Sequence, residues 1–270
     1  MRVLITGAAG GLGRIACKTC INAGHIVFGC DLSGNNQQYA PGTIVIPTDV
    51  TDIDSVLSLS ETLVGYGSID AIVHLAGVFA AGPLLETETS VLTYTLDVNL
   101  LGVARINLAC ARQLVENKGR IIIVSSELGV FSPAPFTGQY VISKHALESY
   151  ATTLRREVKS QKISVTTLRP GSFSTGMHHK ALDAYHMIET SSKWYGPIIT
   201  KAMPLIKREM KRSHAPEIIA STILRTLETK HPKRYIAIKQ SPLLLLMNLF
   251  PVWLQDAMYA TVFTNTIEDL

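Results

Sequence analysis

Residues 1–20 read MRVLITGAAGGLGRIACKTC. The apolar run Val3–Ile5 stops at Thr6, a glycine-rich turn occupies residues 7–13, and a helical stretch follows. A strand, a glycine turn and a helix in this order let the backbone approach a pyrophosphate, to which the start of the helix offers free N–H groups. The turn fits two glycine spacings from different branches of nucleotide-binding enzymes: Gly7–Gly11–Gly13 and Gly7–Gly10–Gly13. It therefore predicts a dinucleotide site and leaves the spacing open.

The rest of the chain alternates apolar β-type runs with helical stretches. The expected strands are Arg2–Thr6, Ile26–Cys30, Thr43–Pro47, Asp70–His74, Arg120–Ser125, Ile163–Leu168 and Arg234–Ile238. The expected helices are Leu12–Ala23, Ile53–Val64, Ser90–Glu116, Tyr140–Lys159 and Pro216–Lys230. The apolar runs are continuous, as in strands covered on both faces. This order predicts an α/β fold, a doubly wound parallel sheet of Rossmann type.

Composition indicates one globular unit, residues 1–270. The chain is 47% hydrophobic and 17% charged, enough for one core, and its net charge of +4 gives no argument for nucleic acid. Its four cysteines follow no secreted pattern, which predicts buried free thiols in a reducing compartment, the cytoplasm. The N-terminal stretch lacks the long apolar run of a signal peptide, and Leu243–Met247 is too short to span a bilayer.

Two segments depart from the alternation. Residues 176–213 lie where such sheets carry insertions near a ligand, so we expect a substrate lid. Residues 241–270 are apolar and are expected to form an extension packed on the domain or on a partner subunit.

Asp31 decides the expected cofactor. It ends the second strand, near the offset of about twenty residues at which an acid meets the adenosine ribose. A carboxylate there accepts hydrogen bonds from ribose hydroxyls and repels a 2′-phosphate, and no Arg or Lys lies in the turn. NAD(H) is therefore favoured over NADP(H).

Two further turns are candidates for cofactor contacts. Asp49-Val50 follows the third strand, where the acid meets the adenine amino group or caps the next helix, a task that Asp52 fills equally well. Ala76-Gly77 follows the fourth strand, where small residues let the chain pass close to a cofactor or form a plain tight turn.

The stretch from Ser125 to Glu148 carries the candidate chemistry. Tyr140 and Lys144 are four residues apart at the start of a helix and share one face. An ammonium favours a phenolate, so Lys144 is expected to lower the pKa of Tyr140 and let it exchange a proton with an alcohol or carbonyl. A serine hydroxyl from the fifth strand can hold the same oxygen.

At these residues the chain resembles the short-chain dehydrogenase/reductase family. The matching segments, in family order, are TGAAGGLG (6–13), Asp31, Asp49-Val50, Ala76-Gly77, Asn99, Ser125-Ser126, YVISK (140–144) and RPGSFST (169–175). The resemblance implies a seven-stranded doubly wound fold and hydride transfer to or from a nicotinamide.

The resemblance also implies roles for individual residues. Tyr140 is the acid/base, Lys144 binds the nicotinamide ribose, Ser126 orients the substrate oxygen, and Asn99 holds a water in a relay to Lys144. It selects Gly7, Gly11 and Gly13 as the working glycines, and the uncharged Gly10 is a second argument for NAD. The expected cofactor-binding residues are Thr6, Gly7, Gly10, Gly11, Leu12, Gly13, Asp31, Asp49, Val50, Ala76, Gly77, Tyr140, Lys144, Pro170, Gly171, Phe173 and Thr175.

The sequence departs from the family pattern in three places. His74-Leu75 replaces two asparagines, which leaves the rigidity of that turn in doubt. Ser126 precedes Tyr140 by fourteen residues, one more than expected, so Ser125 stays an alternative. Phe173 replaces a smaller aliphatic residue and is expected to narrow the site.

The apolar lid and extension suggest the substrate and partners. We expect a hydrophobic alcohol or ketone of the steroid, retinoid or lipid-derived kind, as in the hydroxysteroid and retinol branch that residues 234–263 resemble. A basic cluster at Lys201, Lys207, Arg208, Lys211 and Arg212 is expected to be a solvated helix face rather than a membrane contact. His178 and His179 lack partners at ligand spacing, so no metal is expected.

Two rival functions share the fold. One is a non-catalytic nucleotide-sensing protein, against which the retention of Ser126, Tyr140, Lys144 and Asn99 argues. The other is an extended-branch sugar-nucleotide epimerase or dehydratase, which the second glycine spacing favours and RPGSFST opposes. The resemblance further implies a homodimer or homotetramer built on helices 90–116 and 140–159.

Overall fold

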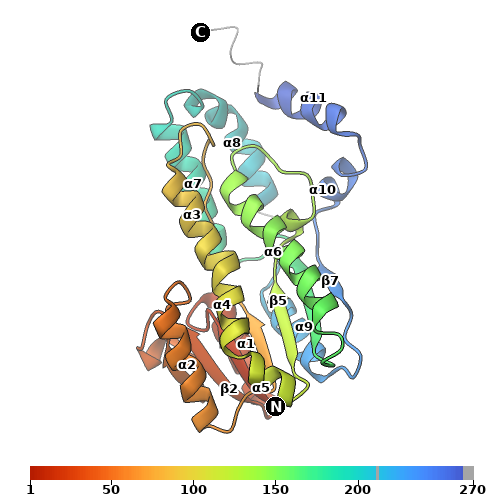
Figure 1. The fold of residues 1–270 in the computed structure, drawn as a ribbon. Helices are drawn as coiled ribbons and strands as arrows, with labels where there is room; N and C mark the ends of the chain where they lie inside the picture. Colours follow the sequence, from red (N-terminus) through yellow and green to blue (C-terminus); the bar gives the residue numbers. More distant parts are fainter. Residues whose placement is uncertain (211–212, 264–270) are drawn as a thin grey trace.

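The computed structural model describes residues 1–210 and 213–263, and its centre is a sheet of seven parallel strands (Figure 1). The strands are β1 (Arg2–Thr6), β2 (Ile26–Asp31), β3 (Ile44–Pro47), β4 (Ala71–His74), β5 (Arg120–Val124), β6 (Ser164–Pro170) and β7 (Tyr235–Ile238). Their order across the sheet is β3-β2-β1-β4-β5-β6-β7. The chain order reverses between β1 and β4, and ligands bind at such a switch point, beyond the carboxyl ends of the strands. The predicted doubly wound fold is confirmed.

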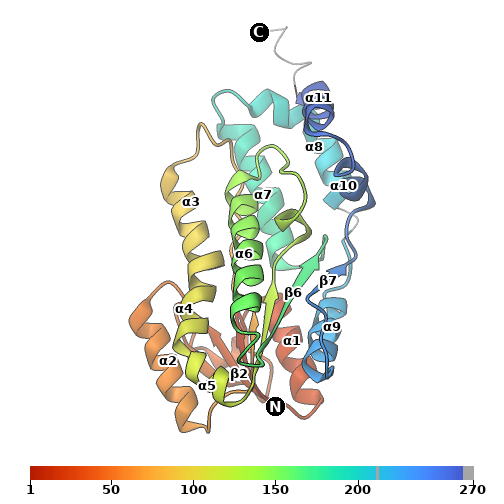
Figure 2. The same ribbon diagram turned by 45° about the vertical axis from the view of Figure 1, so that its right-hand side comes forward.

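Helices cover both faces of this sheet. They are α1 (Gly11–Asn22), α2 (Ile53–Gly65), α3 (Thr89–Leu96), α4 (Gly102–Ala109), α5 (Ala111–Glu116), α6 (Gly138–Glu157) and α9 (Glu217–Glu228). One core cluster joins one sheet face to α1 and α9, and a second joins the other face to α2, α4 and α6. Figure 2 shows α1 and α9 on the opposite side of the sheet from α2, α4 and α5.

Apolar side chains at helical spacing explain these layers. In α2, Val56, Leu59 and Leu63 are buried against the sheet, and Asp52 caps the helix by accepting a hydrogen bond from Asp54 N. Complete burial of one such side chain is worth about 1.5–3 kcal/mol. Asp52 therefore has the capping role that the sequence left open between it and Asp49.

The helix expected over Ser90–Glu116 forms with one change of winding and one interruption. A π-helical turn, η2 (Asp97–Leu101), separates α3 from α4, and α5 starts after Cys110. At Gly102 a Cβ atom would lie 2.8 Å from a methyl carbon of Val50, so the segment passes very close to the turn after β3. A π-turn inserts one extra residue, often at a functional site, and periodicity alone does not show it.

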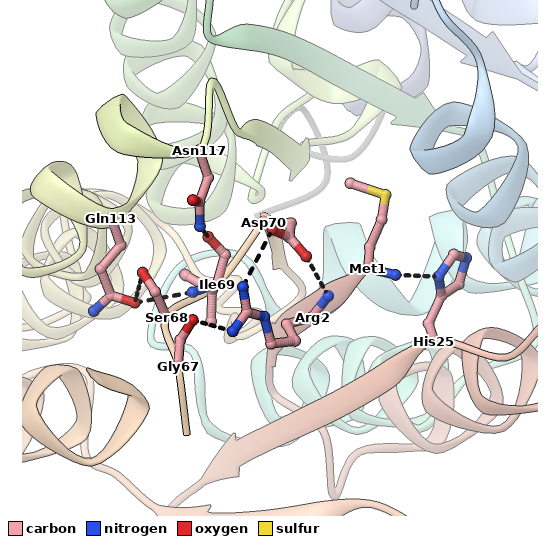
Figure 3. Close-up of polar contacts among 9 residues, drawn as sticks. All are labelled: Met1, Arg2, His25, Gly67, Ser68, Ile69, Asp70, Gln113 and Asn117. Carbon is pink, nitrogen blue, oxygen red and sulfur yellow. Dashed lines mark hydrogen bonds and ion pairs between the residues drawn. The ribbon is translucent and has the colours of Figure 1, made fainter. Parts of the chain in front are cut away.

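The amino end of the sheet is held by polar contacts far from the carboxyl ends of the strands (Figure 3). Asp70 accepts a hydrogen bond from Arg2 N at 2.7 Å and pairs with the Arg2 guanidinium at 3.9 Å. Gln113 Oε1 accepts from Ile69 N, and Asn117 donates to Ile69 O. These contacts fix the start of β4 against β1 and α5, and with it the position of the turn after β4.

Residues 176–213 and 241–263 lie at the carboxyl end of the strands. The first segment forms α7 (Gly176–Ser191) and α8 (Gly196–Met210), and the second forms α10 (Pro242–Met247) and α11 (Val252–Phe263). Ile188, Ile199 and Met203 make a small core of their own between α7 and α8. No helix in the described ranges has both the length and the apolar character needed to cross a bilayer.

Several predicted features lie outside the described residues. They are the side chains of Met177, His178 and His179, residues Lys211 and Arg212, and residues 264–270. Elsewhere the four cysteines are free and buried, as predicted. Burial raises the pKa of Cys17 and Cys110 to about 12, so both are unreactive thiols.

Candidate active site

A cavity of about 670 Å³ opens at the carboxyl ends of the strands, around the switch point between β1 and β4. It is lined by sixteen of the predicted cofactor-binding residues and by the candidate Ser126: Gly7, Gly10, Gly11, Leu12, Gly13, Asp31, Asp49, Val50, Ala76, Gly77, Ser126, Tyr140, Lys144, Pro170, Gly171, Phe173 and Thr175. Thr6 and Asn99 are the predicted residues that do not line it. The fold thus brings segments from the whole first two thirds of the chain to one site.

The glycine turn is shaped by close backbone approach. Gly7 has φ +69°, and a Cβ atom there would lie 2.7 Å from Ala76 N. At Gly13 it would lie 2.1 Å from Gly7 O, and at Gly10 3.2 Å from the same atom. A Cβ at Gly11 would meet no chain atom within 4 Å. Packing therefore requires glycine at 7 and 13, and glycine at 11 leaves room in the cavity for a ligand at the N-terminus of α1.

Asp31 lies beside this turn. Its Oδ2 accepts a hydrogen bond from Ala9 N at 3.1 Å and its Oδ1 one from Leu32 N at 2.8 Å. Among the cavity-lining residues the cations are Lys144 and Lys180, so no arginine lines the cavity beside Asp31. An acid without a neighbouring cation suits ribose hydroxyls better than a 2′-phosphate.

Thr6 supports the turn after β4 instead of lining the cavity. Its Oγ1 accepts hydrogen bonds from Leu75 N and Ala76 N, both at 3.1 Å. His74 is buried and its Nε2 lies 2.9 Å from Asn107 Oδ1. The missing asparagine pair left the rigidity of this turn in doubt. The two hydrogen bonds to Thr6 fix the turn in place of that pair.

Ser126 and Tyr140 come together at the end of β5. Ser126 caps the 3-10 turn η3 (Glu127–Gly129) by accepting from Leu128 N, and it lines the same cavity as Tyr140, whose pKa its side chain lowers. The Oγ of Ser125 is buried without a hydrogen-bond partner in the described chain and packs near Gly129. The geometry therefore favours Ser126 over Ser125 as the partner of the phenol.

The expected lowering of the Tyr140 pKa is wrong for this structure. Burial raises the pKa of Tyr140 to about 12; the polar side chain of Ser126 opposes this rise and the charge of Glu127 adds to it. The Lys144 ammonium lies 5.6 Å from the Tyr140 ring centroid and donates to Val124 O at 3.3 Å. Burial lowers the pKa of Lys144 to about 8, so the ammonium that was expected to stabilise a phenolate is itself destabilised.

Asn99 ties the η2 turn to its surroundings. Its Oδ1 accepts from Val78 N at 2.8 Å, and its Nδ2 donates to Val78 O and to Ser143 Oγ. Ser143 in turn donates to Tyr140 O. Because both side-chain atoms are engaged, Asn99 connects the turn after β4 to α6 and positions the helix that carries Tyr140 and Lys144.

Comparison with known proteins identifies the family. The sequence profile of the family described as short chain dehydrogenase matches residues 1–186. The chain belongs to the short-chain dehydrogenase family. It is an oxidoreductase of that family, and the fold binds a nicotinamide dinucleotide, NAD(P).

Relatives of this short-chain dehydrogenase span most of its length. The dehydrogenase/reductase SDR family member 7B of Xenopus tropicalis is 26% identical over 253 residues, covering 87% of this chain and 76% of the relative. The 3-ketodihydrosphingosine reductase of Bacteroides thetaiotaomicron is 29% identical over 235 residues, covering 85% and 84%. A short-chain dehydrogenase of Burkholderia cenocepacia, solved in complex with NADP, superposes with a TM-score of 0.71 at 18% identity, covering 97% and 96%. At that identity the structural likeness shows the fold alone.

Sequence reasoning missed two residues at the substrate end of this site. Phe79 lines the cavity, and its ring centroid lies 5.0 Å from that of Tyr140. Glu127 also lines it and is buried, directly after Ser126. No spacing rule points to Phe79, whereas an acid immediately after the serine pair was a signal that could have been noticed.

The loop between β5 and α6 reaches both the lid and the extension. Phe136 has φ +66°, a strained value for a bulky residue. Its ring contacts those of Tyr195, just before α8, and Phe263 of α11, with centroids 5.4 and 5.5 Å apart. The extra residue between Ser126 and Tyr140 therefore lies in a loop that joins the two apolar segments above the cavity.

Among the described residues, no group of three His, Cys, Asp or Glu side chains is close enough together to hold a metal ion.

Proposed function

We propose that this short-chain dehydrogenase interconverts an alcohol and a carbonyl, with Tyr140 as acid/base and Ser126 as the residue that orients the substrate oxygen. The observation that carries the proposal is that one cavity is lined by Ser126, Tyr140 and Lys144 at one end and by the glycine turn at the other. When bound, NAD(P) supplies or accepts the hydride. Tyr140 gives or takes the proton at the substrate oxygen, and Lys144 and Asn99 position the helix and the ribose.

The cofactor is NAD(H) in this proposal. Asp31 supports it, because its carboxylate lies at the cavity without a neighbouring cation. The open space beside Gly11 fits a pyrophosphate at the start of α1. Asp49 also lines the cavity, although its Oδ1 is engaged by Thr51 N and Thr51 Oγ1.

The proposed substrate is a hydrophobic, lipid-like alcohol or ketone. The apolar segments α7–α8 and α10–α11 lie above the cavity and support this class. One relative is named for the reduction of 3-ketodihydrosphingosine. The segments that we propose as a lid, 176–213, and as an apolar extension, 241–270, would then enclose an apolar chain.

Exposed apolar residues and buried cysteines support proposals on assembly and location. We propose a homodimer or homotetramer built on α3–α5 and α6, where Tyr94, Leu101, Leu108 and Val115 are exposed at intervals of seven residues. We propose a cytoplasmic protein, because its cysteines are free and buried. The exposed Leu249, Val252 and Trp253 favour contact of the extension with a membrane surface.

The test of the proposed reaction is the variant Tyr140→Phe. Removal of the phenol proton should lower turnover of long-chain alcohols and ketones about 10²–10⁴-fold and leave nucleotide binding intact. Nicotinamide absorbance measures the turnover, and NADH fluorescence measures the binding. A wild-type protein that binds nucleotide and turns over nothing, with no difference in Tyr140→Phe, would contradict the proposal in favour of a nucleotide-sensing protein.

A further inference from the structure

Glu127 is a buried carboxylate at the substrate end of the cavity. Its residue is 6% exposed, it lines the cavity directly after Ser126, and its Oε2 accepts a hydrogen bond from Ser241 N at 2.7 Å. Across residues 1–210 and 213–263, Oε1 has no hydrogen-bond donor, and no Lys, Arg or His forms an ion pair with this carboxylate.

One backbone donor leaves this group incompletely satisfied. A carboxylate has about four acceptor positions on its two oxygens, and buried charges in proteins are generally paired. The two ammonium groups among the cavity-lining residues, Lys144 and Lys180, both lie outside ion-pair distance of Glu127. The described chain therefore supplies no cation to this carboxylate, and Oε1, which is not among the buried unpartnered atoms, is open to a donor in the cavity.

The position of this group relates it to the reacting oxygen. Glu127 follows Ser126 in the chain, and its charge raises the pKa of Tyr140, so the carboxylate and the phenol are electrostatically coupled. A cation bound at Glu127 would lie in the cavity that Ser126 and Tyr140 also line.

We propose that the Glu127 carboxylate binds an ammonium group of the substrate next to the reacting carbon. The substrate class is then an apolar amino ketone or amino alcohol. This inference rests on the proposed function and narrows it. In the reducing direction, hydride from NADH or NADPH forms the new C–H bond, the carbonyl oxygen takes a proton from Tyr140, and the ammonium stays intact.

A purely structural role for Glu127 makes different predictions. Ser241 is the N-cap of α10, so the bond from its N–H could serve only to fasten the extension. Glu127→Gln keeps an oxygen that accepts from Ser241 N and removes the charge. Ser241→Pro removes the N–H donor at φ −65°, an angle that proline adopts, and leaves the charge in place. Ser241→Ala is its matched control, since it loses only the capping hydroxyl.

The experiment compares an α-aminododecanone with the dodecanone that lacks only the amine, at neutral pH and with each nicotinamide cofactor. We expect wild type to favour the amino ketone in kcat/KM by about tenfold or more, the worth of a charge-assisted hydrogen bond. Glu127→Gln should lower this ratio about tenfold. Both serine variants should keep it, whatever their effect on stability.

Three results would overturn the inference. They are a wild type that reduces the plain ketone without preferring the amine, a Glu127→Gln variant with the wild-type ratio, and a Ser241→Pro variant that loses the ratio as fully as Glu127→Gln. In each of these cases the proposed alcohol–carbonyl reaction is unaffected.

If wild type reduces neither ketone, the proposed function is wrong and the inference is wrong with it. Should Glu127→Gln not fold, competition decides: dodecylamine must inhibit wild-type reduction of the plain ketone more strongly than dodecanol does.

Discussion

At the residue scale, burial controls the acid–base groups of the site. It raises the pKa of Tyr140 to about 12 and lowers that of Lys144 to about 8, so in each case burial disfavours the charged form. The spacing of Tyr140 and Lys144 showed that they share a helix face. It did not show that the surrounding core would remove water from both.

The buried ammonium of Lys144 predicts a pH-dependent stability. Its native pKa is about 8 and its ordinary value is 10.5, so the unfolded chain binds more protons between these pH values. The stability of wild type relative to Lys144→Met should therefore rise by about 3 kcal/mol as the pH rises through this range. Urea unfolding of both proteins across that range measures it, and effects of other groups cancel in the comparison. A constant difference would mean that Lys144 is not buried as a charged group.

Asp31 and Gly10 predict the cofactor preference. Asp31→Ala removes the negative charge, and Gly10→Arg adds a positive one beside the same part of the cavity. The double variant should shift the ratio of kcat/KM values for NADH and NADPH toward NADPH by about tenfold or more. A Cβ at Gly10 lies 3.2 Å from Gly7 O, so the turn must yield by a few tenths of an ångström. Gly10→Ala with Asp31→Ala controls for that strain, and equal ratios in both double variants would refute the role of charge.

At the element scale, the column α3–α5 carries an exposed apolar stripe. Tyr94, Leu101, Leu108 and Val115 recur at intervals of seven residues, and Leu108 is 75% exposed. Figures 1 and 2 show α3, α4 and α5 following one another along the outside of the molecule, where a second copy could pack. Unpartnered apolar stripes of this kind are typical of protein interfaces.

Leu108→Glu tests this interface. A charge at the centre of a self-association surface is left unpaired and desolvated, so the variant should shift to a smaller assembly. Light scattering after size-exclusion chromatography measures the mass. Leu57→Glu is the control, because Leu57 is an exposed leucine on α2, outside the stripe. A wild-type protein that is monomeric would show that this stripe has another use.

At the scale of the whole molecule, the two apolar segments meet above the carboxyl ends of the strands. The extension starts at Ser241, whose N–H donates to Glu127 in the cavity, and α11 packs on α8. Beyond Ser241 the extension exposes Leu249 at 80% and Trp253 at 70%. An apolar surface that begins at the site can receive an apolar substrate from a lipid layer.

Vesicle sedimentation distinguishes the extension from the basic cluster as a membrane contact. Asp256 is the only charged residue in 241–263, so binding through the extension should persist on neutral vesicles and at high salt. Leu249→Ser with Trp253→Ser should abolish it. Lys207→Ser with Arg208→Ser, on the exposed face of α8, should leave it unchanged. Binding only to anionic vesicles, lost at high salt, would assign the contact to the basic cluster.

The sequence by itself determined the fold and much of the site. Apolar runs located all seven strands, and the inner strands are continuous runs because strands covered on both faces carry no polar alternation. The glycine turn, Asp31 and the Tyr140–Lys144 pair indicated the cavity residues because each sits at a fixed offset from the end of a strand or the start of a helix. Parallel strands bring those ends to one edge, so local patterns were enough to place them.

Only the tertiary structure decided how these residues are surrounded. The π-turn at 97–101 changes the winding of the expected helix, Thr6 accepts two hydrogen bonds from the turn after β4, and Asn99 directs its side chain to Val78 and Ser143. The position of Glu127 after the serine pair was visible in the sequence, but its burial and its contact with Ser241 at the start of the extension were not. Burial and contacts between distant segments arise from packing, and no local spacing in the chain encodes them.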